Sequence, residues 1–195
     1  MPKTRGNATT LEYALLGLLD QRPLSGYDLR RIFATTPFTH YSDSPGVVYP
    51  ALRRLEARGW IAPHTGVTLN ARRRRPLQLT AAGSRCFRAW LLMPPTRDEV
   101  VHDMGALYLR FAFMSQAVPP TVPRRFLASL RGLLEAHLGE LERYHARAIR
   151  TMPPTGRLVF EHGIEEIRHT VAWCARSGKT LSGSKSSRGK RGGAS

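Results

Sequence analysis

The sequence has little cysteine, no long apolar run and no apolar leader, and each absence excludes a class of protein. Among 195 residues only Cys86 and Cys174 are cysteines, which are too few and too far apart for a disulfide framework or a zinc site. No stretch of about 18 consecutive apolar residues occurs, which excludes a membrane-spanning helix. The polar start, MPKTRGNATT, lacks the apolar segment of a secretory signal. We therefore expect a protein of the reducing cytoplasm.

Acidic residues are also scarce, with fourteen Asp and Glu against thirty Lys and Arg and a formal net charge of +16. The excess is +9 in residues 1–93, +2 in residues 94–177 and +5 in residues 178–195. A strongly basic field attracts polyanions such as nucleic acid. The distribution predicts a basic working domain, a near-neutral assembly domain and a basic tail. The tail is rich in Gly, Ser and Lys, a composition typical of disorder.

Residues 1–93 are expected to form a winged helix-turn-helix domain, in a fold that is mostly α. Leucines at helical spacing predict a helix over 10–21, Ser25 caps a second, and Ser44-Pro45 begins a third that stops at Gly59. After Gly59 the spacing of the apolar residues changes from that of a helix to that of a strand. Residues 60–62 and 77–79 predict an antiparallel hairpin, and Thr80 caps a fourth helix that reaches about Met93.

Residues 94–177 predict an all-helical dimerisation domain of three helices, separated by paired prolines. The first carries apolar positions from Val100 to Phe111, the second runs from Pro123 to about Thr151, and the third carries positions from Phe160 to Cys174. The second has a heptad seam whose length indicates a partner helix, and therefore a homodimer. The expected interface residues are Leu127, Leu130, Leu134, His137, Leu141 and Tyr144.

The third helix and the hairpin tip are the candidate DNA contacts. If the helix buries its stripe of Val48, Leu52 and Leu55, its opposite face is turned outward and its amino end enters a major groove. The outward residues are Val47, Pro50, Arg53 and Arg54, and Tyr49 has a hydroxyl within reach of a phosphate. The tip carries Arg72, Arg73, Arg74 and Arg75, which would follow a minor groove or its phosphates.

Pro50 leaves two alternatives for the start of the third helix. If the helix begins at Pro45, Pro50 removes an internal hydrogen bond and bends it. If the regular turn begins near Val47, Pro50 lies in the first turn at little cost.

Four motifs carry a resemblance to a known family. They are LLGLL at 15–19, PLSGYDL at 23–29, VYPALRRLE at 48–56 with GWI at 59–61, and LTAAG at 79–83. In order and spacing these resemble the PadR family of transcriptional regulators. Residues 108–111 and 160–165 resemble the longer helical carboxy-terminal domain of one branch.

The resemblance implies a homodimeric winged-helix repressor that binds double-stranded operator DNA and is released by a small ligand. It assigns DNA contacts to the third helix and the wing, here Ser44, Tyr49, Pro50, Arg53, Arg54 and Arg72–Arg75, and places Tyr27 near the DNA backbone. Relatives often have Ser or Thr where this chain has Val47, so their preferred operator need not transfer. The wing also has Leu77 and Gln78 where an aromatic residue is usual.

Other functions find less support in the sequence. A small hydrophobic or phenolic effector would be lined by Trp90, Tyr108, Phe111 and Phe113. His162, Glu165, Glu166 and His169 lie at helical spacing but do not define a metal site. No phosphate-binding loop, nucleophile elbow or diagnostic pair of carboxylates occurs, so neither an enzyme nor a cofactor is expected. The rival interpretation is a winged-helix module for acidic partners or the nucleoid, without sequence preference.

Overall fold

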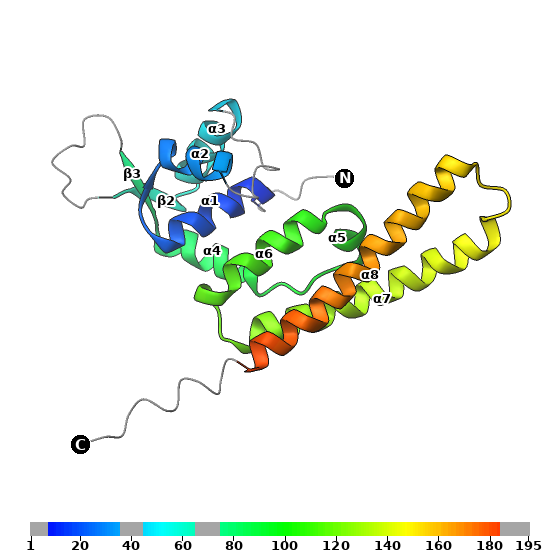
Figure 1. The fold of residues 1–195 in the computed structure, drawn as a ribbon. Helices are drawn as coiled ribbons and strands as arrows, with labels where there is room; N and C mark the ends of the chain where they lie inside the picture. The colour runs from blue at the N-terminus through cyan, green and yellow to red at the C-terminus, as the bar shows by residue number, and fades with distance from the viewer. Residues whose placement is uncertain (1–7, 36–44, 65–74, 184–195) are drawn as a thin grey trace, which may run out of the picture. The chain divides into compact units, whose positions relative to one another are not determined.

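The structure, a computed structural model, describes residues 8–35, 45–64 and 75–183 (Figure 1). The chain divides into two compact units, Met1–Met93 and Pro94–Ser195. Each unit has its own set of helices, and each is described separately below. None of the described helices combines the length and the apolar character that a bilayer crossing requires.

The first unit is a winged helix-turn-helix domain. Its elements are α1 (Thr10–Gln21), β1 (Leu24–Ser25), α2 (Gly26–Thr35), α3 (Pro45–Ala57), β2 (Ile61–Pro63), β3 (Pro76–Leu79) and α4 (Ala81–Leu91). The predicted helix 10–21 and the predicted antiparallel pairing of the wing strands are confirmed, with Ile61 opposite Leu79. The sheet has the order β1-β3-β2, because β1 also pairs antiparallel with β3. That third strand was not predicted.

The ends of these helices follow from local side-chain chemistry. Thr9 and Glu12 form a reciprocal capping box at the start of α1, with each side chain accepting from the other residue's backbone N–H. Gly59 has a φ of 66°, the left-handed conformation that glycine adopts readily after the last turn of a helix. Thr80 caps α4, where its hydroxyl accepts from the Gly83 N–H at 3.1 Å. The predicted stop at Gly59 and the predicted cap at Thr80 are therefore confirmed.

The core of the first unit lies where α1, α2, α3 and α4 meet the sheet. The predicted stripe of α3 is confirmed, since Val48 and Leu55 have no exposed area and Leu52 is 4% exposed. Phe33 of α2 and Phe87 of α4 are completely buried as well. Burying this stripe fixes which face of α3 is turned to solvent.

The second unit consists of α5 (Arg97–His102), α6 (Met104–Ala117), α7 (Thr121–Ala148) and α8 (Pro154–Gly183). Figure 1 shows α7 and α8 as a long antiparallel pair. The single helix predicted across Val100 to Phe111 is wrong, because the chain breaks at Asp103. Its carboxylate accepts from the Ala106 N–H at 3.1 Å and so begins a new helix.

The predicted tail boundary at residue 178 is also wrong. Helix α8 continues through Gly183, and Leu181 follows Cys174 and Gly178 at helical spacing. The hydroxyls of Thr180 and Ser182 bond to carbonyls four residues earlier, at 3.2 and 2.9 Å. These hydroxyls have backbone partners inside the helix, so their polarity does not end it.

Candidate nucleic-acid interface

Helix α3 presents a polar and partly apolar face opposite its buried stripe. Val47 is 42% exposed and Tyr49 39% exposed, and Pro50 and Arg53 are exposed beside them. The helix begins at Pro45, so Pro50 is its sixth residue and lies inside it. Of the two alternatives left open by the sequence, the structure therefore has the proline within the helix, where it lacks an N–H for the preceding turn.

Four of the predicted DNA contacts line one groove on the first unit. Tyr27 comes from α2, Tyr49 and Arg53 come from α3, and Arg75 comes from the base of the wing just before β3. Glu56 also lines this groove. The groove therefore has a net positive formal charge, although one of its charged residues is acidic. The groove brings together two phenol hydroxyls and two guanidinium groups, which are common donors to phosphate oxygens.

Two local features hold α2 and α3 at the groove. The Ser25 hydroxyl donates to Asp28 Oδ2 at 2.6 Å and accepts from the Asp28 N–H at 3.2 Å, which fixes the start of α2. Gly26 then allows a close approach: a Cβ at that position would lie 2.8 Å from Tyr49 Cε1. The Tyr49 ring is therefore positioned against the backbone of α2.

Arg54 has a different environment from Arg53. Its Nε lies 2.6 Å from Oε1 of Glu12, a residue with no exposed area. The second oxygen of Glu12 accepts from Arg58 Nη1 at 3.3 Å and from the Thr9 N–H at 2.9 Å. Arg54 and Arg58 thus neutralise a buried carboxylate, the pairing that a buried charge requires.

This Glu12 cluster was not predicted from the sequence. Thr9 and Glu12 match the capping-box pattern, which explains a Glu at that position without any tertiary partner. The Arg58 guanidinium also lies 5.0 Å from the centre of the Trp60 ring, within cation–π range. The available signal was a single acidic residue in a run that is otherwise apolar, from Leu11 to Leu19.

Several predicted contacts fall outside the described part of the chain. These are Ser44 and three arginines of the wing tip, Arg72, Arg73 and Arg74. Arg75 is described and is exposed.

The candidate effector residues have separate environments. Trp90 belongs to the first unit, where its ring stacks on Tyr13 with 4.3 Å between centroids. In the second unit, Tyr108 and Phe111 each meet the Trp173 ring edge-on at 5.6 Å. Phe113 is 7% exposed and belongs to the core. Tyr108 and Phe111 therefore share one aromatic cluster.

The predicted dimer seam is divided between the interior and the surface of the second unit. Leu127, Leu130 and Leu134 are at most 2% exposed within the single chain, whose own α8 lies along α7. They are not available to a second chain in this arrangement. His137 and Leu141 are partly exposed, and Tyr144 is 52% exposed. The sequence predicted that a helix of another subunit would cover these three leucines. In the structure, α8 of the same chain lies along their helix instead.

The cysteines and the histidine cluster show no reactive arrangement. Burial raises the pKa of the Cys174 thiol to about 11 and also raises the pKa of Cys86, which keeps both thiols protonated at neutral pH. His162 Nε2 lies 3.5 Å from Glu166 Oε1 in an exposed pair. Within the described ranges, no group of three or more potential ligands is placed to hold a metal ion.

Comparison with known proteins agrees with the geometry. Residues 15–89 match the sequence profile of the "Transcriptional regulator PadR-like family". The "Negative transcriptional regulator PadR" of Bacillus subtilis (strain 168) is 31% identical over 168 residues, which is 84% of this chain and 92% of that protein.

Two solved structures of Bacillus subtilis PadR are also similar to this chain. Bacillus subtilis PadR in complex with operator DNA is 22% identical, with a TM-score of 0.43 over 92% of this chain and 99% of that chain. The complex of Bacillus subtilis PadR with p-coumaric acid is 22% identical, with a TM-score of 0.42 over 89% and 99% of the two chains.

Proposed function

The chain belongs to the PadR-like family of transcriptional regulators, and from that premise we propose that it is a sequence-specific repressor that binds operator DNA as a homodimer. We propose repression and not activation because the relative that is 31% identical is named a negative transcriptional regulator. The observation that carries the proposal is the groove on which Tyr27, Tyr49, Arg53 and Arg75 converge.

In the proposed complex, the exposed face of α3 enters the major groove. Val47 and Pro50 are the apolar part of that face and would contact base edges such as the thymine methyl group. Arg53, Arg75 and the two tyrosine hydroxyls would bind phosphates on either side. We assign Arg54 instead to the neutralisation of Glu12, with which its Nε is paired.

The homodimer sets the form of the operator. Two winged-helix domains related by a two-fold axis would place their recognition helices about 34 Å apart. The DNA site would therefore be an inverted repeat. The exposed half of the α7–α8 pair supplies apolar side chains for such a contact, since Tyr144, Leu158 and Val159 are 52%, 66% and 72% exposed.

Release by a small hydrophobic or phenolic ligand is the remaining part of the proposal. The cluster of Tyr108, Phe111 and Trp173 favours it, because aromatic side chains commonly line such sites. A panel of such compounds should change Trp fluorescence and lower operator affinity. If neither quantity changes across the panel, this part is wrong.

The decisive experiment is selection of bound sequences from random duplex DNA by the purified protein at about 150 mM salt, where phosphate contacts alone give weak binding. We expect enrichment of an inverted repeat. Arg53→Ala should weaken binding to that repeat and lower the salt dependence by about one phosphate contact per protomer. Salt-sensitive binding without an enriched motif would instead favour a nucleoid or docking module.

A further inference from the structure

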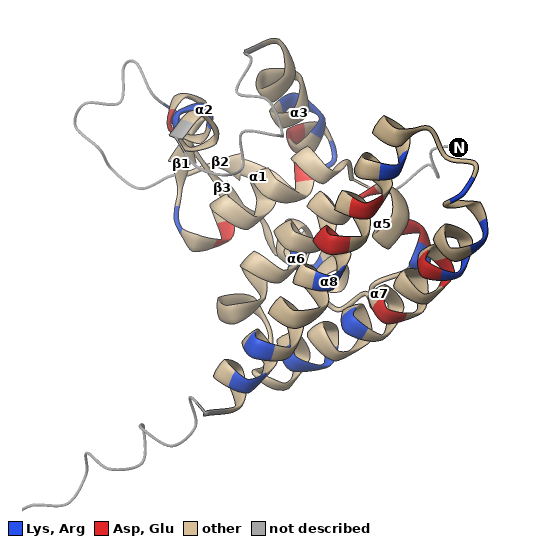
Figure 2. Ribbon diagram, turned by 45° about the vertical axis from the view of Figure 1, so that its right-hand side comes forward, with Lys and Arg blue, Asp and Glu red and all other residues tan. Residues whose placement is uncertain are grey.

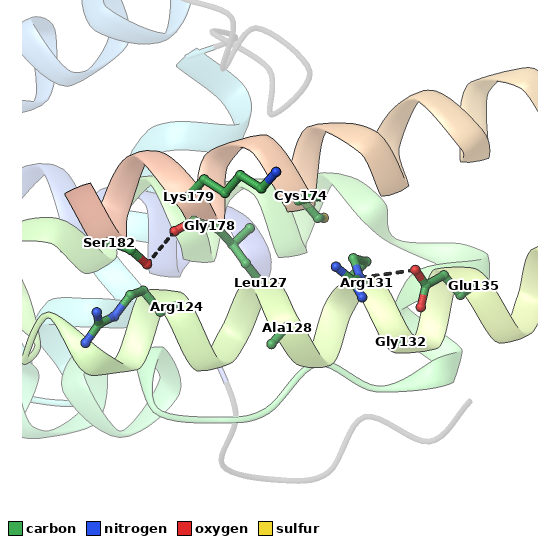
Figure 3. Close-up of a pocket in the computed structure, with 11 residues that line it drawn as sticks. Arg124, Leu127, Ala128, Arg131, Gly132, Glu135, Cys174, Gly178, Lys179 and Ser182 are labelled. Carbon is green, nitrogen blue, oxygen red and sulfur yellow. Dashed lines mark hydrogen bonds and ion pairs between the residues drawn. The ribbon is translucent and has the colours of Figure 1, made fainter. Parts of the chain in front are cut away.

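A second groove, distinct from the DNA-binding face, runs between the start of α7 and the end of α8. It encloses about 590 Å³ and lies wholly within the second unit. Figure 3 shows Arg124 at one end, Arg131 and Glu135 toward the other, and Lys179 and Cys174 on the facing helix. A volume of this size falls in the range of small-molecule sites.

The groove is open because both helices carry glycine there. Gly132 of α7 and Gly178 of α8 line it, and a Cβ added to either would meet no atom within 4 Å. Glycine in a helix interior is unfavourable by about 1 kcal/mol relative to alanine. Two such positions facing one groove keep space open where larger side chains would be tolerated by the fold.

The rim of the groove is basic and its floor is apolar. Arg131 pairs with Glu135 at 3.1 Å, whereas Arg124 and Lys179 have no ion-pair partner in the described part of the chain. Leu127 and Cys174 in the floor are each 2% exposed. In Figure 2 the end of the α7–α8 pair near the close of α8 carries basic residues alone, and acidic and basic residues are mixed farther along both helices.

We propose that this groove binds a free aliphatic carboxylate, with the alkyl chain along the floor and the carboxylate at the basic rim to which Arg124 and Lys179 belong. The lining from Arg124 to Glu135 extends roughly 16 Å along α7 at 1.5 Å per residue, a length that suits an extended chain. The apolar floor gives a small inorganic anion nothing to bury, and the excess of cations disfavours a lipophilic cation. This inference does not depend on DNA binding.

The first test is calorimetric titration of the full-length protein with hexanoate, octanoate and decanoate, all below their micelle-forming concentrations. Burial of each added methylene should raise affinity by about two- to fourfold. Alkyltrimethylammonium ions of equal chain length are the charge-reversed control. Equal binding of both series would show detergent-like adsorption and would overturn the proposal, as would an affinity independent of chain length.

The second test uses matched glycine variants. Gly178→Leu should fill the groove and abolish decanoate binding, whereas Gly178→Ala should retain binding and raise the melting temperature. Arg124→Gln with Lys179→Gln should weaken decanoate binding at least fivefold and leave the binding of decyltrimethylammonium no weaker. If Gly178→Leu instead lowers the mass of the ligand-free protein in solution, the groove is an interface between copies and the ligand proposal is wrong.

A failure of these titrations is distinguishable from a failure of the proposed function, because operator selection uses no ligand. Conversely, carboxylate binding by a protein that selects no operator would leave this site standing.

Discussion

The Arg54→Ala variant tests whether Arg54 has a structural role that its neighbour Arg53, the proposed phosphate contact, does not share. Glu12 is completely buried and its carboxylate has three donors: Arg54 Nε at 2.6 Å, Arg58 Nη1 at 3.3 Å and the Thr9 N–H at 2.9 Å. Arg54→Ala removes the nearest donor and leaves one arginine to balance a buried charge. Arg53, one residue earlier, is exposed and has no ion-pair partner in the described ranges.

The expected loss of stability in Arg54→Ala depends on how deeply Arg54 and Glu12 are each buried. Removing one partner of a fully buried ion pair costs about 3–5 kcal/mol. The Arg54 side chain is 49% exposed, and Arg58 and the Thr9 N–H remain, so the loss should fall to about 1–3 kcal/mol. Arg53→Ala should change stability by less than about 0.5 kcal/mol. For a unit of this size each kcal/mol corresponds to roughly 4–8 °C in melting temperature.

The assay is denaturant unfolding followed by tryptophan fluorescence, because Trp60 lies beside Arg58 in the same cluster. Glu12→Gln provides a double-mutant cycle with Arg54→Ala, in which a coupling energy of about 1–3 kcal/mol is expected. Operator affinity is then measured at a temperature where both arginine variants are folded. Equal stability of the two variants, with a larger loss of DNA affinity for Arg54→Ala, would refute this assignment.

Three further predictions concern other residues. Gly26→Ala would place a Cβ 2.8 Å from Tyr49 Cε1, so it should lower stability by about 1–3 kcal/mol and weaken operator binding, as melting and titration would show. Cys174, whose pKa is raised by burial to about 11, should react slowly with thiol reagents at pH 8 and rapidly only in denaturant; rapid native labelling would contradict it. The Arg157 hydrogen bond lowers the pKa of Glu161. Its contribution to stability is therefore present above the unfolded carboxyl pKa and lost as pH falls through the folded value, and Arg157→Gln should flatten the acid side of the melting-temperature profile.

The helix ends of the first unit could be predicted because each depends on neighbouring residues. Ser25 caps α2 through Asp28, three residues away, and Gly59 ends the turn after α3 through its own φ. Strand β1 could not be predicted in this way. The segment Leu24–Ser25 is too short to show the alternation of apolar and polar residues that marks a strand. It forms a strand only because β3, some fifty residues later, pairs with it.

The leucine seam of α7 shows a different limit. Regular spacing of Leu127, Leu130 and Leu134 correctly indicates that another helix packs against them. Spacing carries no information about which chain supplies that helix. Here α8 of the same chain does so, with Ile164 and Cys174 buried on its length. A contact with a second copy must therefore use residues other than these three leucines, such as the exposed Tyr144.

Arg53 and Arg54 show why a charge pattern identifies a surface more reliably than it identifies a contact. Both residues lie opposite the buried stripe of α3 and both are exposed by area, so helical periodicity gives them the same role. They differ through Glu12, 42 residues earlier than Arg54, whose burial is decided by the packing of α1. Because that carboxylate takes up Arg54 and Arg58, the arginines available for phosphates are fewer than the composition of α3 indicates. The salt dependence of operator binding should accordingly reflect Arg53 and the wing, without a contribution from Arg54.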